Sequence, residues 1–320
     1  MTQSALRSSV DGSSSSSSSS KASTAIPLEV AVFSASAALR AQALGAARVE
    51  LNAPNSYALG GTTPPLSELS LLRDESSSPS SSSTLKIPVR IMIRPRGPPP
   101  SSSSSSSSSS PAAAQDFVYT ADEFQRMKTS IRRFKASGLL VASAHTPPPP
   151  PPSSPHSGDG FVFGILRAAA GPGGNDDVVG IDEHRCRELV ALASPYPCVF
   201  HRAFDQIASR ENAQLLADLG FAGVLTSGGL GNCVDNKASV GRLLEATTSS
   251  SSSSSGLEVI VGGGLRRDNI QVMAEQVRMS SLSTCGSGRA ALHTAALNSS
   301  SRHHEEIDED ELSAMVAQLR

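Results

Sequence analysis

Apolar and polar residues alternate along several short segments of the chain, the pattern of a strand with one buried face. Leu28, Val30 and Val32 share one face of the first segment, and the same two-residue period recurs further on. An apolar run over residues 138–144 is less regular. The predicted strands cover residues 28–33, 47–52, 87–93, 160–166, 198–201, 223–225 and 257–261, with 279–285 as the candidate for an eighth.

Segments of helical character follow these strands. Apolar residues three and four apart, with serine or aspartate at the start, predict helices over residues 34–44, 65–72, 121–135, 182–192, 212–219, 268–276 and 308–319. Strand and helix therefore alternate about eight times, which predicts an α/β protein with a (β/α)8 TIM barrel. An open doubly wound sheet is the competing architecture. The barrel is favoured because the first three strands carry charge on the face opposite the aliphatic one, and a barrel interior can accept it.

Tracts of nearly pure serine or proline interrupt this pattern. They offer no apolar surface to offset the entropy of ordering them, so we predict disordered inserts near residues 74–84, 98–114, 146–158 and 248–255. Residues 1–27 are predicted to be a disordered tail, and residues 28–320 one barrel domain. The insert near 98–114 follows the third strand. It either covers the barrel mouth or is a disordered segment without a role at the site, and the second interpretation is favoured.

The net charge and the lengths of the apolar runs limit which partners and which cellular compartment we expect. The net charge of −2 gives no reason to expect nucleic acid or an anionic membrane as a partner, and no apolar run reaches membrane-spanning length. We expect a cytoplasmic protein, with the nucleus or a weak organelle signal as alternatives, and a homo-oligomer is possible in principle. The four cysteines form no CxxC pair, so free thiols are expected.

Charged side chains stand at or near the carboxyl ends of the predicted strands, where parallel α/β proteins place their chemistry. Glu29, Glu50 and His201 are the candidate acid–base residues, and Arg94 with Arg96 is the candidate clamp for an anion. Arg48 and Arg90 lie lower on their strands. For those two, an internal ion-pair network that closes the barrel is an equally good interpretation.

Glycine-rich turns after two later strands form the second candidate feature. Such turns present backbone N–H groups that can bind a phosphate or carboxylate, although plain tight turns look the same in sequence. The candidate binding residues here are Thr226, Ser227, Gly228, Gly262, Gly263 and Gly264, together with Arg202 and Asp205. Residues 303–306 (HHEE) could bind a metal ion, but a solvated surface run is the favoured interpretation, because they lie in a polar stretch beyond the last predicted strand.

The strand ends also carry recognisable motifs. In chain order these are EVAVFS, RVELN, GGTTP, IMIRPRG, FHRAFD, LTSG and GGG, at residues 29–34, 48–52, 60–64, 91–97, 200–205, 225–228 and 262–264. Together they resemble the CutC family of copper homeostasis proteins, which has a (β/α)8 barrel fold. The resemblance runs from about residue 28 to residue 289, interrupted by the low-complexity inserts.

The resemblance implies a protein of copper homeostasis that binds or handles copper ions, but the sequence departs from the family at the presumed ligands. Copper-binding proposals for the family rest on cysteines in the first two strands, where this chain has Ala31 and Asn52. The family's last strand commonly carries a histidine before its serine, and Cys285 is interpreted as occupying that place. Soft thiolates select Cu(I), so Cys285 and His201 are the remaining candidate ligands.

Two functional hypotheses therefore stand side by side. The first is a copper-binding or copper-handling protein of the CutC type. The second is a TIM-barrel enzyme that acts on a small phosphorylated or carboxylate metabolite, with Arg94 and Arg96 holding the anion and His201 or Glu50 moving a proton. A scaffold that has lost both activities is a third possibility.

Overall fold

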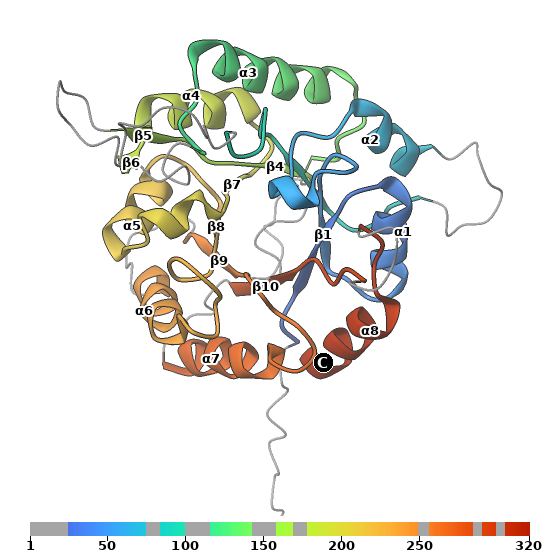
Figure 1. The fold of residues 1–320 in the computed structure, drawn as a ribbon, viewed down its shortest axis with the longest axis vertical. Helices are drawn as coiled ribbons and strands as arrows, with labels where there is room; N and C mark the ends of the chain where they lie inside the picture. The colour runs from blue at the N-terminus through green and yellow to red at the C-terminus, as the bar shows by residue number, and fades with distance from the viewer. Residues whose placement is uncertain are drawn as a thin grey trace, which may run out of the picture.

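The computed structural model describes residues 25–74, 84–99, 116–142, 158–168, 178–248, 256–283, 290–298 and 305–320. Most of the predicted tail and inserts lie outside these residues. Eight parallel strands close into a barrel at the centre of the molecule, and the helices form a ring around it (Figure 1). The predicted (β/α)8 TIM barrel is confirmed.

The barrel strands are short and follow the predicted alternation closely. In chain order they are β1 (Leu28–Val32), β2 (Arg48–Leu51), β3 (Val89–Met92), β4 (Gly160–Phe163), β7 (Cys198–Phe200), β8 (Gly223–Thr226), β9 (Glu258–Val261) and β10 (Ala290–Thr294). Each strand pairs with the next, and β10 closes the ring by pairing with β1. In that last pairing Glu29 and His293 are direct partners in register.

The outer helices begin where the sequence offers a capping side chain. Ser34, Asp182, Ser209 and Asp308 each accept a backbone N–H at a helix start, and Thr120 forms a complete capping box with Glu123. The helices are α1 (Ala35–Ala43), α2 (Leu66–Arg73), α3 (Ala121–Ala136), α4 (Glu183–Ala193), α5 (Arg210–Asp218), α6 (Lys237–Thr248), α7 (Ile270–Ser283) and α8 (Glu309–Leu319), with 3-10 turns η1 (Tyr57–Leu59) and η3 (Arg202–Gln206).

The alternation within each strand separates two apolar layers. Outward-facing residues such as Val30, Ile91 and Phe200 pack in the large cluster between barrel and helices. Inward-facing residues form a second, smaller cluster inside the barrel, consisting of Met92, Val162, Val199, Leu225, Ile260 and Ala291. This inner apolar layer fills part of the barrel interior.

The expected eighth strand over residues 279–285 is wrong. Helix α7 continues through Ser283, and the strand that closes the barrel is β10. Met273, Ala274 and Val277 are buried on one face of α7, and Ser280 continues that face into the segment whose sequence mimics an alternating pattern. Cys285, placed in that strand from the resemblance, lies outside the described residues, as do His303 and His304.

The predicted strand over residues 160–166 divides into two elements. β4 ends at Phe163, and after Gly164 the chain enters β5 (Leu166–Ala168), which pairs antiparallel with β6 (Val178–Ile181) outside the barrel. This hairpin was not predicted from the sequence. Among the described residues of the run 138–144, no strand forms.

Charged side chains fill the amino-terminal end of the barrel interior. The Arg48 guanidinium pairs with Glu29, and its Nη1 lies 3.2 Å from Oε2 of Glu258. Arg90 is fully buried and donates to the carbonyl of Gly158 at 2.6 Å. The internal network is therefore the interpretation that the structure supports for Arg48 and Arg90.

Candidate functional site

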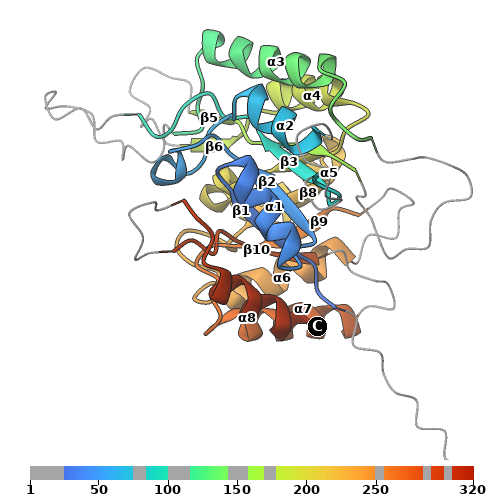
Figure 2. The ribbon, with the colours of Figure 1, turned by 90° about the vertical axis from the view of Figure 1, so that its right-hand side faces the viewer.

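A cavity of about 490 Å³ opens at the carboxyl ends of the barrel strands. In the side view the β5–β6 hairpin and the turn η1 lie toward this end, while the carboxyl terminus lies at the other (Figure 2). The walls combine charged, amide and apolar side chains from loops far apart in sequence. This is the end at which TIM barrels carry their active sites.

Glu50 and His293 line this cavity, and the buried Glu29, which does not line it, lies next to His293. Nε2 of His293 lies 3.8 Å from Oε1 of Glu29 and 3.7 Å from Oε2 of Glu50. The other oxygen of each carboxylate is already held, because Arg48 donates to Glu29 Oε2 and Asn52 Nδ2 donates to Glu50 Oε1 at 3.1 Å. Two carboxylate oxygens therefore converge on one imidazole nitrogen.

The charge states of this cluster follow from its surroundings. Burial works against the charged form of His293, but the carboxylates of Glu50 and Glu29 outweigh it and raise the pKa of the imidazole. For Glu29, burial is outweighed in turn by the Arg48 guanidinium and by His293, so the pKa of that carboxyl is lowered. The two carboxylates thus favour the protonated form of His293.

His201 also lines the cavity, but in a different electrostatic state. Its Nδ1 accepts the backbone N–H of Ala203 at 3.2 Å, while Nε2 is buried with no hydrogen-bond partner among the described residues. Burial, assisted by the nearby Arg94 charge, lowers the pKa of His201 to about 3. The prediction that His201 acts as an acid or base near neutral pH stays a prediction, and the lowered pKa favours the uncharged imidazole.

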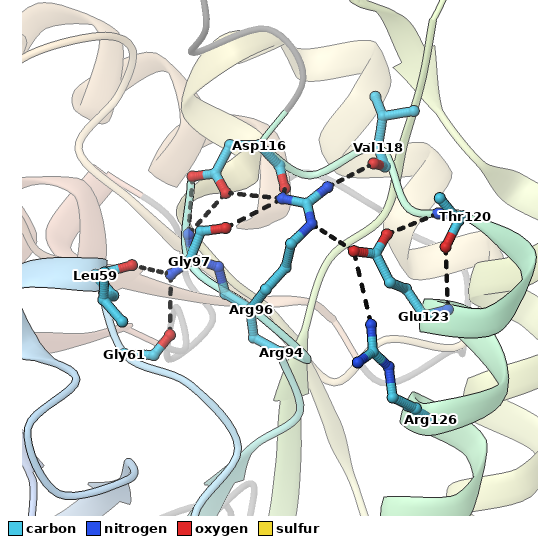
Figure 3. A network of polar contacts seen from close by, with 10 residues as sticks. All are labelled: Leu59, Gly61, Arg94, Arg96, Gly97, Asp116, Val118, Thr120, Glu123 and Arg126. Carbon is cyan, nitrogen blue, oxygen red and sulfur yellow. Dashed lines mark hydrogen bonds and ion pairs between the residues drawn. The ribbon is translucent and has the colours of Figure 1, made fainter. Parts of the chain in front are cut away.

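Arg94 and Arg96 are engaged in the wall of the barrel mouth (Figure 3). Arg94 Nη2 donates to both oxygens of Asp116 at 2.8 Å, and Nη1 donates to the carbonyls of Leu59 and Gly61. Arg96 Nε donates to Glu123 at 2.6 Å, and its other nitrogens donate to backbone carbonyls. These contacts hold the loops after β2 and β3 together, in place of the predicted anion clamp.

Asp205 organises the loops after β7 and β8. Its Oδ1 accepts the Thr226 hydroxyl at 2.6 Å and the Ser227 N–H at 2.9 Å, and its Oδ2 accepts the Ser227 hydroxyl and Arg202 Nε, each at 2.8 Å. The Gly228 N–H in turn donates to the Thr226 hydroxyl at 2.8 Å. The TSG motif thus supports Arg202, whose guanidinium borders the cavity and is 44% exposed.

The three-glycine turn after β9 lets two side chains approach the backbone. A Cβ on Gly262 would lie 3.2 Å from Nδ1 of His293, and one on Gly263 would lie 3.3 Å from Cζ of Arg202. Gly263 and Gly264 have φ values of 101° and 82°, which favour glycine. The turn therefore positions the imidazole and the guanidinium, a structural reason for glycine that differs from the predicted anion binding.

Cysteine thiolates are missing from the part of the cavity wall that the structure describes, where the thioether of Met92 is the soft donor. Ala31 and Asn52 line it at the positions that the resemblance assigns to cysteines. The described cysteines, Cys186, Cys198 and Cys233, are buried elsewhere, and burial raises the pKa of each thiol. The described wall therefore lacks the set of several thiolate and thioether ligands that selects Cu(I). The Glu29–Glu50–His293 cluster offers the oxygen and imidazole donors that suit Cu(II) or another divalent ion.

Comparison with known proteins shows the family of the chain. The family model for the CutC family matches residues 26–101 and 159–287 of the chain. The chain belongs to the CutC family. It is 30% identical to the copper homeostasis protein cutC homolog of Homo sapiens over 270 residues, which are 84% of this chain and 72% of that protein.

Bacterial members extend the likeness. The family protein CutC of Porphyromonas gingivalis is 30% identical over 251 residues, covering 78% of this chain and 76% of its own length. The solved structure of CutC from Streptococcus agalactiae matches with a TM-score of 0.55 at 23% identity, over 84% of this chain and 98% of that one, and so supports the fold.

His293 is the central residue that the sequence analysis missed. The position of the family's last-strand histidine was assigned to Cys285, because the last strand was placed too early in the chain. The segment AALHT, with two small residues and an alternating leucine, carried the signal. Arg266 was also missed. It borders the cavity, and its guanidinium makes no hydrogen bond or ion pair with the residues that the structure describes.

Within the described residues, no helix has the length and apolar character needed to cross a membrane.

Proposed function

We propose that the barrel mouth is an active site for proton relocation in a small carboxylate or phosphate compound, an isomerisation or epimerisation. The observation that carries this proposal is the buried pair of Glu50 and His293, 3.7 Å apart in the cavity wall, where the carboxylates raise the pKa of the imidazole. An acid and a base at one location are what such a reaction requires. Arg202 and Arg266 supply positive charge at the rim.

The proton can be followed through one turnover. Glu50 Oε2 takes a proton from a carbon of the bound compound, and His293 Nε2 gives its own proton to another position of that compound. The proton on Glu50 then passes to His293, 3.7 Å away, and restores the starting state. Glu29 stabilises the imidazolium from the other side and is itself held by Arg48. No proton is gained or lost overall, and no oxidant or reductant is needed.

Deuterium incorporation tests this function with a small set of candidate compounds. The purified protein is incubated in deuterium oxide with pyruvate, acetoacetate or dihydroxyacetone phosphate, and carbon-bound deuterium is measured by mass spectrometry. We expect exchange above the rate without protein, reduced about a hundredfold or more in Glu50→Gln and in His293→Gln. The exposed His184 provides a matched control, since His184→Gln should keep full exchange. Equal exchange in Glu50→Gln and wild type would refute the proposal.

Copper binding is the second candidate function, and membership of the CutC family together with the three convergent donors favours it. Glu29 Oε1, Glu50 Oε2 and His293 Nε2 all lie within 4.8 Å of one another, and Oε2 of Glu50 is a buried oxygen without a hydrogen-bond partner among the described residues. This donor set favours Cu(II) over Cu(I). A cation that binds at this cluster needs the neutral imidazole of His293 as a ligand, so its binding would release a proton from a protonated His293.

A competition titration separates the two candidates. Cu(II), Zn(II) and, under reducing conditions, Cu(I) are titrated against a chelator of known affinity with wild type, Glu50→Gln and Cys198→Ala. Tight Cu(II) binding that is lost only in Glu50→Gln supports the metal function at this cluster. Equal binding by all three proteins would assign copper to another part of the chain.

A further inference from the structure

We infer that His201 is a binding residue with a fixed, uncharged Nε2–H donor, and that this donor meets a carbonyl, carboxylate or phosphoryl oxygen of the ligand. The inference rests on the proposed function and deepens it. It assigns to the cavity a second histidine whose work is to polarise an oxygen, while His293 carries the proton.

The hydrogen bond at Nδ1 fixes the tautomer of His201. Nδ1 accepts the N–H of Ala203 in the first turn of η3, so it carries no proton of its own. A neutral imidazole has one proton, which must then be on Nε2. The orientation of the donor is therefore set by the backbone that follows β7.

Packing holds the ring in this orientation. The Phe117 ring centroid lies 4.9 Å from that of His201, and a Cβ on Gly164 would come within 2.7 Å of Nδ1. The side chain has no room to rotate toward β4. An immobile donor loses little entropy when it binds a ligand, which suits a group that orients an oxygen.

The Nε2–H has no acceptor in the described part of the protein. Only 4% of His201 is exposed, and Nε2 is among the buried side-chain atoms without a hydrogen-bond partner. A buried donor without a hydrogen bond costs free energy. We therefore expect a ligand in the cavity to supply the acceptor for this N–H. The cavity wall that contains His201 is the same one that contains Glu50 and His293.

Positive charge on the imidazole is also disfavoured at this place, which keeps the donor neutral. Arg94 lies near the ring and is itself fixed by Asp116, and the rings of Phe117 and Phe200 also neighbour the imidazole. A neutral imidazole next to a developing oxyanion donates a hydrogen bond without giving up its proton, because its second pKa is far too high. The substrate class follows: a compound whose carbonyl or phosphoryl oxygen gains negative charge when Glu50 removes a proton.

Nitrogen NMR of histidine-labelled protein tests the inference. The chain has seven histidines, and the His201 signals are assigned by their disappearance in His201→Gln. We expect the Nε2–H tautomer of a neutral ring, unchanged between neutral pH and mildly acidic pH. An Nδ1–H tautomer, or titration of the ring near neutral pH, would overturn the inference.

Ligand addition gives the second readout, with inorganic phosphate and acetoacetate as probes. We expect a shift of the His201 Nε2 signal, and about tenfold weaker probe binding in His201→Leu than in His201→Gln, whose amide keeps a donor near the same place. If the probes shift His293 alone, the ligand site stands and the role of His201 falls. If they shift neither histidine, both the inference and the proposed ligand class fall. If His201 shifts but no deuterium exchange occurs with any compound, the donor stands without the proposed reaction.

Discussion

The two sides of the barrel mouth use charged residues in opposite ways. On the side of Arg94 and Arg96, carboxylates and backbone carbonyls accept hydrogen bonds from both terminal nitrogens of each guanidinium, while Nε of Arg94 has no partner among the described residues (Figure 3). On the side of Glu50 and His293, buried polar atoms face the cavity without a hydrogen-bond partner among the described residues. Both sides present charge at strand ends, so charge alone does not identify a binding site. A binding site is identified by buried polar atoms whose hydrogen-bond partners must come from a ligand.

The difference has an energetic basis. A buried ion that is completely paired and hydrogen-bonded serves the fold, and removing its partner leaves an uncompensated charge. A buried polar atom without a partner lowers stability in the empty protein and gains free energy when a ligand arrives. The first side should therefore respond to mutation in stability, and the second in binding and catalysis.

Asp116→Asn should give the largest effect on stability. It leaves the Arg94 guanidinium, whose side chain is 3% exposed, without its bidentate partner, and we expect a loss of about 3–5 kcal/mol in the free energy of unfolding. Chemical denaturation measures this. Asp122→Asn, an exposed site on α3, is the matched control and should change little. A loss below about 1 kcal/mol would show that the side of Arg94 and Arg96 does not stabilise the fold.

The two histidines of the cavity should give stability opposite dependences on pH. The pKa of His201 is about 3, below its unfolded value, so its contribution is complete above pH 6.5 and is lost as the pH falls toward 3. The pKa of His293 is raised, so its contribution is complete below 6.5 and is lost as the pH rises through the folded pKa. Denaturation of wild type, His201→Gln and His293→Gln between about pH 5 and 8 should reveal differences of about 1–3 kcal/mol. Parallel curves would contradict the assignment of charge.

Gly262→Ala should disturb the second side while sparing the first. The added methyl would come within 3.2 Å of His293 and 3.0 Å of Leu225 Cδ1, so the imidazole must shift. We expect a loss of about 1–2 kcal/mol in stability and a larger relative loss of deuterium exchange. Gly256→Ala is the control, because its nearest neighbour is at an ordinary 3.4 Å. Equal deuterium exchange in Gly262→Ala and Gly256→Ala would show that the position of His293 does not matter for the reaction.

Arg266→Ala should have the smallest effect on the fold. Its guanidinium has no hydrogen-bonding or ion-pair partner within the described chain, so the free energy of unfolding should change by less than about 0.5 kcal/mol. Affinity for inorganic phosphate, measured by calorimetry, should fall about tenfold and depend on salt. Unchanged affinity would remove Arg266 from the anion site.

The fold was predictable because alternating strands and capped helices are local patterns. The strand faces of Val30 and Val32 against Glu29, and the caps at Ser34 and Asp182, act within a few residues of the chain. The place of β10 was not predictable in the same way. Residues 279–285 show a short alternating pattern that the helical packing of α7 overrides, and only pairing with β1, far away in sequence, selects Ala290–Thr294 as a strand.

The site was predictable in its residue types and less so in their roles. Glu50 and His201 do line the cavity. The titration of His201 could not be inferred, because it depends on burial and on Arg94, which come from another strand. The partners of Arg94 could not be inferred either, since Asp116 follows a serine-rich stretch with no pattern to place it.

The pairing of β1 with β10 has a consequence for how the protein comes into being. Glu29 is made among the first residues of the barrel and His293 among the last, yet they are neighbours across the closing pair of strands. The cluster cannot exist on a ribosome-bound chain until β10 has emerged and joined the waiting first strand. Any activity of the Glu29–Glu50–His293 cluster is therefore absent from the nascent chain and begins only when synthesis has passed the last strand and the ring has closed.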